Sequence, residues 1–152
     1  MKYIGPDFCN ITTLLTDEEL LIQKTANEFV IKEFMPLVNE YYEKGSFPVD
    51  LIPKMGELGF FGATLPKKYG GSEISSTAYG LIMQELEKGD SGLRSVCSVQ
   101  GGLVMYPIFQ YGTEAQKDKW LPKLASGEAV GCFGLTESNH GSDPGGMTTK
   151  AV

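Results

Sequence analysis

The sequence predicts an all-α fold, an orthogonal domain of about six helices, followed by the first strand of a β-domain that is otherwise missing. Apolar residues recur at helical spacing through most of the chain. Two segments open with the pattern of a capping box, Thr16 with Glu19 and Thr113 with Gln116. A short apolar run suited to a buried strand occurs only near the end, at Ala129–Thr136. One strand has nothing to pair with in this sequence, so we expect the chain to continue or to pair with a partner.

Residues 1–14 are predicted to form a loosely ordered arm. The first helix then starts at Thr16, and its buried face is formed by residues at helical spacing, which are Ile22, Ala26, Phe29, Val30 and Phe34. Pro36 disfavours helical geometry at Met35, so a break is expected there. A second helical piece continues to Gly45.

Three further elements are expected between residues 50 and 92. Asp50 can cap a short helix that Gly59 ends. Turn residues predict a loop over 65–71. The next helix begins at residue 75 or 76, and the run Gly89–Gly92 interrupts it.

The most apolar helix is predicted over 91–109, with a small and weakly polar surface formed by Ser95, Ser98, Gln100, Gly101 and Gly102. Each mid-helix glycine lowers helix stability by about 1 kcal/mol relative to alanine. Close approach of a ligand or another backbone would explain why glycines stand here; the alternative is that the segment is simply a poor helix former. The helix that Thr113 caps ends at Ser126-Gly127. Three aromatic residues are expected in the core or in a subunit contact, namely Tyr106, Tyr111 and Trp120.

Composition narrows the class of protein. The 152 residues are 41% hydrophobic and 21% charged, which is typical of one globular domain. A net charge of -6 without a Lys/Arg cluster argues against a nucleic-acid surface. There is no apolar run long enough for a membrane span and no targeting pattern, so a cytoplasmic location is expected. The three cysteines and the single histidine, His140, predict no metal site, disulfide framework or His-based triad.

Arg94 is the sharpest candidate binding residue. It falls in the N-terminal turn of a helix, where the helix dipole does not favour a cation, so another partner is expected. A guanidinium beside Ser95 and Ser98 suits a carboxylate ligand. The alternative is an internal salt bridge to Glu87 or Asp90, and the two interpretations are compatible.

The second candidate site is the stretch from Cys132 to Asp143. Its polar, small-residue half leaves backbone N–H groups free to face an acceptor-rich ligand, such as a pyrophosphate or a flavin ring edge. An ordinary strand and turn is the alternative. His140 is expected to face solvent, with a phosphate contact as the other option. Ser142 lacks a general base, so nucleophilic catalysis is not predicted.

Several motifs in order make the chain resemble the acyl-CoA dehydrogenases. They are Met55–Gly62, Tyr69-Gly70-Gly71, Tyr111–Lys117 followed by Trp120-Leu121-Pro122, and Thr136-Glu137 with Gly141-Ser142-Asp143. The stretch Glu85–Gln100 resembles the glutaryl-CoA dehydrogenase branch in particular. The resemblance begins near Leu15 and covers most of the chain.

The resemblance implies a division into an arm (1–14), the family's N-terminal helical domain (15–127) and the start of its middle β-domain (128–152). It also implies FAD-dependent α,β-dehydrogenation of an acyl-CoA, with glutaryl-CoA as the substrate of the branch. Electrons would pass to an electron-transfer flavoprotein, and the full-length protein would be a homotetramer.

The resemblance assigns roles to individual residues. Those that match substrate-binding positions are Glu87, Arg94, Ser95, Ser98 and Ser142; those that match FAD-binding positions are Phe133, Leu135, Thr136, Gly141 and Ser142. Two departures put the rigidity of the loop in doubt. Ser138 stands where proline is usual, and His140 stands where a small residue is usual.

The family's catalytic glutamate lies in a C-terminal domain that this sequence does not contain, so no catalytic residue is assigned. We therefore expect the 152 residues alone to bind FAD weakly and not to turn over. Two alternatives remain: a non-catalytic helical module for binding or assembly, and an acyl-CoA dehydrogenase for a different short acyl chain.

Overall fold

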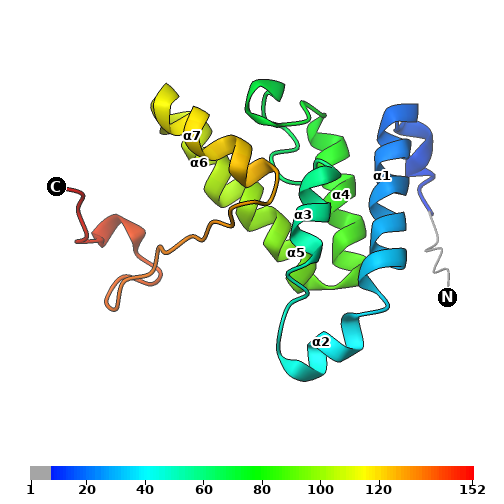
Figure 1. Cartoon of the computed structure of the whole chain (residues 1–152), viewed down its shortest axis with the longest axis horizontal. Coiled ribbons are helices and arrows are strands. Elements are labelled where there is room, and N and C mark those ends of the chain that lie inside the picture. Colours follow the sequence, from blue (N-terminus) through cyan, green and yellow to red (C-terminus); the bar gives the residue numbers. More distant parts are fainter. Residues whose placement is uncertain (1–7) are drawn as a thin grey trace.

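The computed structural model describes residues 8–152 and is helical, which confirms the predicted fold class. The α-helices are α1 (Asp17–Phe29), α2 (Val38–Lys44), α3 (Leu51–Glu57), α4 (Ser76–Gly89), α5 (Ser91–Ser98), α6 (Tyr106–Tyr111) and α7 (Glu114–Ala125). They form one body, and the chain from about residue 130 leaves it as an extended tail (Figure 1). Within the described part, no helix is long and apolar enough to cross a membrane.

Short helices of other types join these elements. The 3-10 helices are η1 (Ile11–Leu14), η3 (Lys67–Tyr69) and η5 (Pro144–Gly146), and the π-helices are η2 (Val30–Phe34) and η4 (Val99–Met105). Because η4 connects α5 directly to α6, the predicted helix over 91–109 is a single helical run with a widened middle.

The predicted capping boxes are both formed. The Thr16 hydroxyl accepts from the Glu19 N–H (3.2 Å), and the Glu19 carboxylate accepts from the Thr16 N–H (3.0 Å). Thr113 and Gln116 make the same reciprocal pair at the start of α7. At the predicted interruption, the Asp90 carboxylate caps α5 by accepting from the Gly92 N–H (2.7 Å). Local sequence therefore sets these helix starts correctly.

The predicted break near Pro36 is present, since η2 ends at Phe34 and α2 begins at Val38. Two local details were wrong. Met35 itself keeps helical geometry (φ -57°, ψ -33°), because the π-helical turn carries its N–H to the Val30 carbonyl (2.9 Å) before the chain turns at Pro36. Asp50 makes no side-chain cap, because the N–H groups of Leu51 and Ile52 are already bonded to backbone carbonyls of the preceding turn.

The core lies between α1, α3, α4, α5 and α7. Its largest fully buried side chains include Met55, Phe60, Phe61, Leu86, Leu93, Met105 and Leu121. Burying each of these contributes about 1.5–3 kcal/mol relative to leaving it exposed. Tyr106, Tyr111 and Trp120 are 51%, 83% and 42% exposed, so of the two predicted places the core is wrong and the subunit contact stays a prediction.

Close backbone packing explains two glycines in the sequence motifs. A Cβ atom on Gly56 of α3 would lie 2.3 Å from the carbonyl oxygen of Ser126, at the end of α7. A Cβ atom on Gly71 would lie 2.0 Å from the carbonyl oxygen of Leu65, across the loop that carries η3. A residue with a side chain fits neither position without a backbone shift.

A buried carboxylate ties α1 to α4. Glu85 is 2% exposed, and its oxygens accept from the Gln23 amide (3.1 Å), the Asn27 amide (2.9 Å) and the Lys88 ammonium (2.6 Å). Hydrogen bonds of this kind offset the cost of burying the carboxylate. The partners from α1 explain how a carboxylate is tolerated at this buried position.

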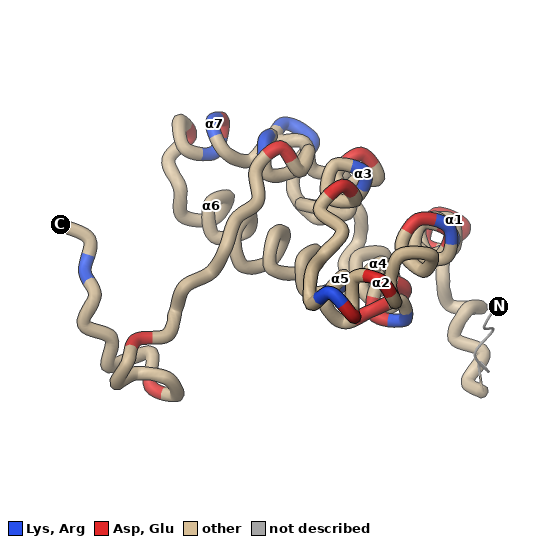
Figure 2. Tube along the Cα trace, turned by 60° about the horizontal axis from the view of Figure 1, so that its bottom comes forward, with Lys and Arg blue, Asp and Glu red and all other residues tan. Residues whose placement is uncertain are grey.

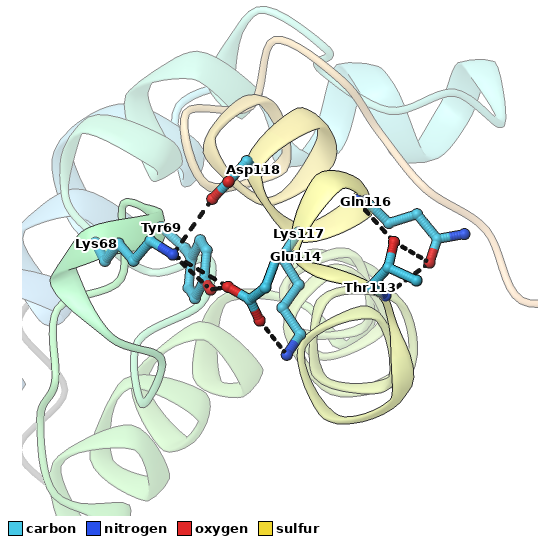
Figure 3. A network of polar contacts seen from close by, with 7 residues as sticks. All are labelled: Lys68, Tyr69, Thr113, Glu114, Gln116, Lys117 and Asp118. Atoms are coloured by element: carbon cyan, nitrogen blue, oxygen red, sulfur yellow. Dashed lines mark hydrogen bonds and ion pairs between the residues drawn. The ribbon is translucent and has the colours of Figure 1, made fainter.

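A more exposed polar network joins η3 to α7 (Figure 3). The Glu114 carboxylate accepts from the Tyr69 hydroxyl (2.8 Å), from Lys68 (3.1 Å) and from Lys117 (3.0 Å). Lys68 also lies 3.5 Å from Asp118. The hydrogen bonds from Lys117, Tyr69 and Lys68 lower the pKa of Glu114 to about 2.

The predicted strand at 129–136 does not form. Among residues 8–152 the β-pairing consists of one isolated antiparallel bridge between Glu137 and His140. The prediction of a strand was wrong because a strand needs a neighbour to accept its ladder of hydrogen bonds, and no other segment of residues 8–152 offers one.

We predict that Glu85→Ala lowers the free energy of unfolding by roughly 2–4 kcal/mol, because it leaves the half-buried amides of Gln23 and Asn27 without their acceptor. Urea unfolding of the purified chain measures this. Glu43→Ala is the control, since Glu43 is exposed and has no ion-pair partner among the residues described. A loss no larger than that of the control would contradict the proposed tie between α1 and α4.

Glu114 should stabilise the fold in a pH-dependent way. Its folded pKa of about 2 lies below its ordinary value of 4.5, so its contribution is fully present above pH 4.5 and is lost as pH falls towards 2. We predict that the unfolding midpoints of wild type and Glu114→Gln differ at pH 7, and that the difference shrinks as pH falls from 4.5 towards 2. Urea titrations at several pH values test this, and a pH-independent difference would contradict it.

Candidate functional site

The hairpin of α4 and α5 brings together the residues predicted to bind a carboxylate. Glu87 lies near the end of α4 and Arg94 near the start of α5. The Arg94 Nε donates to the Glu87 carboxylate (2.7 Å), and its Nη1 donates to the Ser98 hydroxyl (3.1 Å). The internal ion pair that the sequence suggested therefore forms with Glu87, while Asp90 serves as the cap of α5.

The guanidinium remains available to a further ligand. The Arg94 side chain is 36% exposed, and Glu87 occupies it through Nε alone. The Ser98 hydroxyl, which donates to the Ser95 carbonyl (3.2 Å), holds Nη1 in place. A carboxylate could approach the outer N–H groups without displacing Glu87, because a guanidinium carries five donors in a fixed plane.

Gln100 holds the start of the second candidate segment against the helical body. Its side chain is 1% exposed. The Gln100 amide donates to the carbonyls of Leu124 (2.9 Å) and Ala129 (2.8 Å), and its oxygen accepts from the Gly131 N–H (2.9 Å). These bonds connect η4, the end of α7 and the first residues of the tail.

The helical pattern of the sequence does not predict this role. It assigned Gln100 to the helix surface, which is wrong, because Gln100 points towards α7 and its amide satisfies buried backbone groups there. A single long amide in the most apolar helix was the signal that could have found it, since a buried amide needs several partners.

The two glycines that follow Gln100 are not required by packing inside the described chain. A Cβ atom on Gly101 would make an ordinary contact of 3.6 Å with the Gly62 nitrogen, and one on Gly102 would meet nothing within 4 Å. Close approach of another backbone therefore does not account for the pair. Gly102 leaves an open position beside the exposed Leu103 on the same helical run as Arg94.

The residues predicted to face a flavin lie in the extended tail. Phe133 is 51% exposed and Leu135 is 41% exposed. No hydrogen bond joins the backbone N–H groups of residues 132–136 to any other part of residues 8–152. Unpaired N–H groups and exposed apolar side chains on one segment fit the polar edge and the apolar face of a flavin ring.

A compact loop follows this segment. The Glu137 carboxylate accepts from the Thr148 N–H (2.9 Å), the Thr148 hydroxyl (3.1 Å) and the Thr149 N–H (2.8 Å). These bonds, led by that from the Thr148 backbone, lower the pKa of Glu137 to about 2. Gly141 and Ser142 lie exposed on the loop that Glu137 closes.

His140 is more covered than the sequence suggested. Its side chain is 24% exposed, and its Nδ1 has no hydrogen-bond partner, with the nearest Asp143 carboxylate oxygen 3.9 Å away. The expectation of a solvent-facing ring was therefore only partly right. The ring lies against the loop, since a Cβ atom on Gly146 would lie 2.6 Å from its Nδ1.

The predicted residues therefore fall into two groups. Glu87, Arg94, Ser95 and Ser98 lie on the α4–α5 hairpin, whereas the others lie in the tail, which projects away from the helices in both views (Figures 1 and 2). Residues 129–136 of the tail carry no charged side chain, and this stretch is tan throughout in Figure 2.

Comparison with known proteins identifies the family. The model of the acyl-CoA dehydrogenase N-terminal domain matches residues 16–128, which is most of the chain. The chain belongs to the acyl-CoA dehydrogenase family. The family resemblance seen in the sequence motifs is thus confirmed.

Individual acyl-CoA dehydrogenases are similar over nearly the whole chain. The probable acyl-CoA dehydrogenase YngJ of Bacillus subtilis is 41% identical over 140 residues, which is 91% of this chain and 36% of that protein. A crystal structure of glutaryl-CoA dehydrogenase from Mycobacterium smegmatis is 48% identical, with a TM-score of 0.90, over 95% of this chain and 37% of that one.

A second structure of glutaryl-CoA dehydrogenase from Mycobacterium smegmatis, in complex with FADH2, is 45% identical, with a TM-score of 0.89. It matches 92% of this chain and 36% of its own. The chain therefore spans a little over a third of the length of these acyl-CoA dehydrogenases.

Proposed function

We propose that the protein carrying this chain is an FAD-dependent acyl-CoA dehydrogenase that acts on glutaryl-CoA. The observation that supports the substrate most directly is the Arg94 guanidinium, held by Glu87 and Ser98 with donors to spare. The 48% identity to a glutaryl-CoA dehydrogenase supports the same branch. A monocarboxylic acyl chain would give this partly exposed cation nothing to bind.

In this proposal the α4–α5 hairpin binds the free carboxylate of the glutaryl group. Arg94 donates to that carboxylate, while Ser95 and Ser98 contribute hydroxyl groups beside it. Glu87 orients the guanidinium from the other side through the 2.7 Å bond to Nε. Ser142, on the tail loop, is assigned to the acyl-CoA and to the cofactor.

The tail supplies the cofactor contacts. FAD, when bound, accepts a hydride from the substrate. Phe133 and Leu135 lie along the flavin ring, Thr136 and the neighbouring N–H groups bind its polar edge, and Gly141 with Ser142 approaches the pyrophosphate. The exposure of this segment and its unpaired backbone groups support the assignment.

The remaining expectations belong to the whole protein. The helical residues 15–127 and the tail 128–152 would be the family's N-terminal domain and the start of its middle β-domain. We propose an electron-transfer flavoprotein as the electron acceptor, a homotetramer as the assembly and the cytoplasm as the location. The residues described offer no credible base for α-proton removal, so the 152 residues alone should not turn over.

The first test compares the native gene product with this chain. We predict that the protein from the native gene shows flavin absorption bands that bleach when glutaryl-CoA is added, and that the 152-residue chain gives no substrate-dependent bleaching. Intact mass and visible spectra measure both. A gene product of about the mass of this chain without flavin bands would favour the non-catalytic module instead.

Arg94→Ala separates glutaryl-CoA from other acyl substrates. Loss of a buried charge contact to the substrate carboxylate should lower kcat/KM for glutaryl-CoA by roughly 100-fold, and that for butyryl-CoA by less than about threefold. Lys119→Ala, which removes an exposed cation on α7, is the control. Equal losses for both acyl-CoA substrates would point to an acyl-CoA dehydrogenase for a different short chain.

A further inference from the structure

We propose that Glu137 is a positioning residue that fixes the loop of residues 138–147 in the form that binds FAD. This inference rests on the proposed function and adds a residue to it. Glu137 is not itself assigned a contact with cofactor or substrate. It acts through the backbone of Thr148 and Thr149.

The contacts of Glu137 close the loop on itself. One carboxylate oxygen accepts from the N–H and the hydroxyl of Thr148, and the other accepts from the N–H of Thr149. Both ends of the loop are thereby held at one side chain. Hydrogen bonds to a charged acceptor are stronger than those between neutral groups, which favours the closed form even near solvent.

The inside of the loop is packed as well. A Cβ atom on Gly146 would lie 2.6 Å from both the His140 Nδ1 and an Asp143 carboxylate oxygen. The Glu137–His140 bridge and the 3-10 turn η5 define the rest of the path. The loop thus has one defined shape, with Gly141 and Ser142 on its exposed side.

The sequence of the loop explains why a side chain is needed to hold its shape. Ser138 and Asn139 place no restriction on the backbone comparable to that of a proline. The tail also lacks sheet partners within residues 8–152. Because a preformed loop loses less conformational entropy when a ligand binds, the Glu137 carboxylate should raise the affinity for FAD without touching it.

The low pKa of Glu137 is consistent with this role. The carboxylate stays ionised at every pH at which the enzyme would work, so it remains an acceptor for all three donors. Glutamine in its place keeps the size of the side chain. It offers one acceptor oxygen and an NH2 group that faces donors, so at least one of the contacts to Thr148 or Thr149 is lost.

The test uses the FAD-loaded protein expressed from the native gene. We expect Glu137→Gln to weaken FAD binding by about tenfold and to speed hydrogen exchange of the Thr148 and Thr149 amides to a similar degree. Thr148→Val, which removes one donor, should weaken FAD binding by about two- to threefold. The thermal unfolding midpoint of the apoprotein should not change, because the loop lies outside the helical core.

Glu128→Gln is the matched control, since Glu128 is an exposed carboxylate near the start of the tail that pairs with Lys123 alone through its side chain. Unchanged FAD affinity in Glu137→Gln overturns the proposed role, even where amide exchange becomes faster. A wild type that binds no FAD overturns the proposed function and, with it, the role of Glu137. FAD dissociation constants from flavin fluorescence separate these outcomes.

Discussion

The buried amide of Gln100 is the contact on which the arrangement of the two candidate groups depends. It is the side chain that joins the helical run carrying Arg94 to the first residues of the tail. Its three partners are backbone groups, the carbonyls of Leu124 and Ala129 and the N–H of Gly131, and leaving a buried polar group unpaired costs about 1–3 kcal/mol. Gln100 therefore helps to fix the start of the tail, together with the bond from the Ala129 N–H to the Lys123 carbonyl (3.1 Å).

Two carboxylates on α4 illustrate how burial decides function. Glu85 faces α1 and is enclosed by Gln23, Asn27 and Lys88, so it stabilises the fold. Glu87, two residues on, faces the start of α5 and remains half exposed with Arg94. Both are acidic residues of one helix, and the helical turn places them on different faces.

The tail is held in place at both ends, but backbone groups between them have no hydrogen-bond partner. Its beginning is held by Gln100 and its end is closed by Glu137, yet the residues between them have exposed apolar side chains and unpaired backbone groups. An exposed segment of this kind favours binding to another surface, because its hydrogen bonds and apolar contacts are still to be made. In the proposed enzyme that surface is FAD together with the rest of the β-domain.

The sequence by itself determined the features that depend on neighbouring residues. The capping boxes at Thr16 and Thr113, the interruption at Asp90 and the all-α class follow from local hydrogen bonding and apolar periodicity. The order of the motifs identified the family. The short spacing between Glu87 and Arg94 across the helix interruption at Asp90 predicted their ion pair. Only the tertiary structure decided the burial of Gln100 and the partners of Glu85. Those outcomes depend on groups 24 to 62 residues apart, which no local pattern brings together.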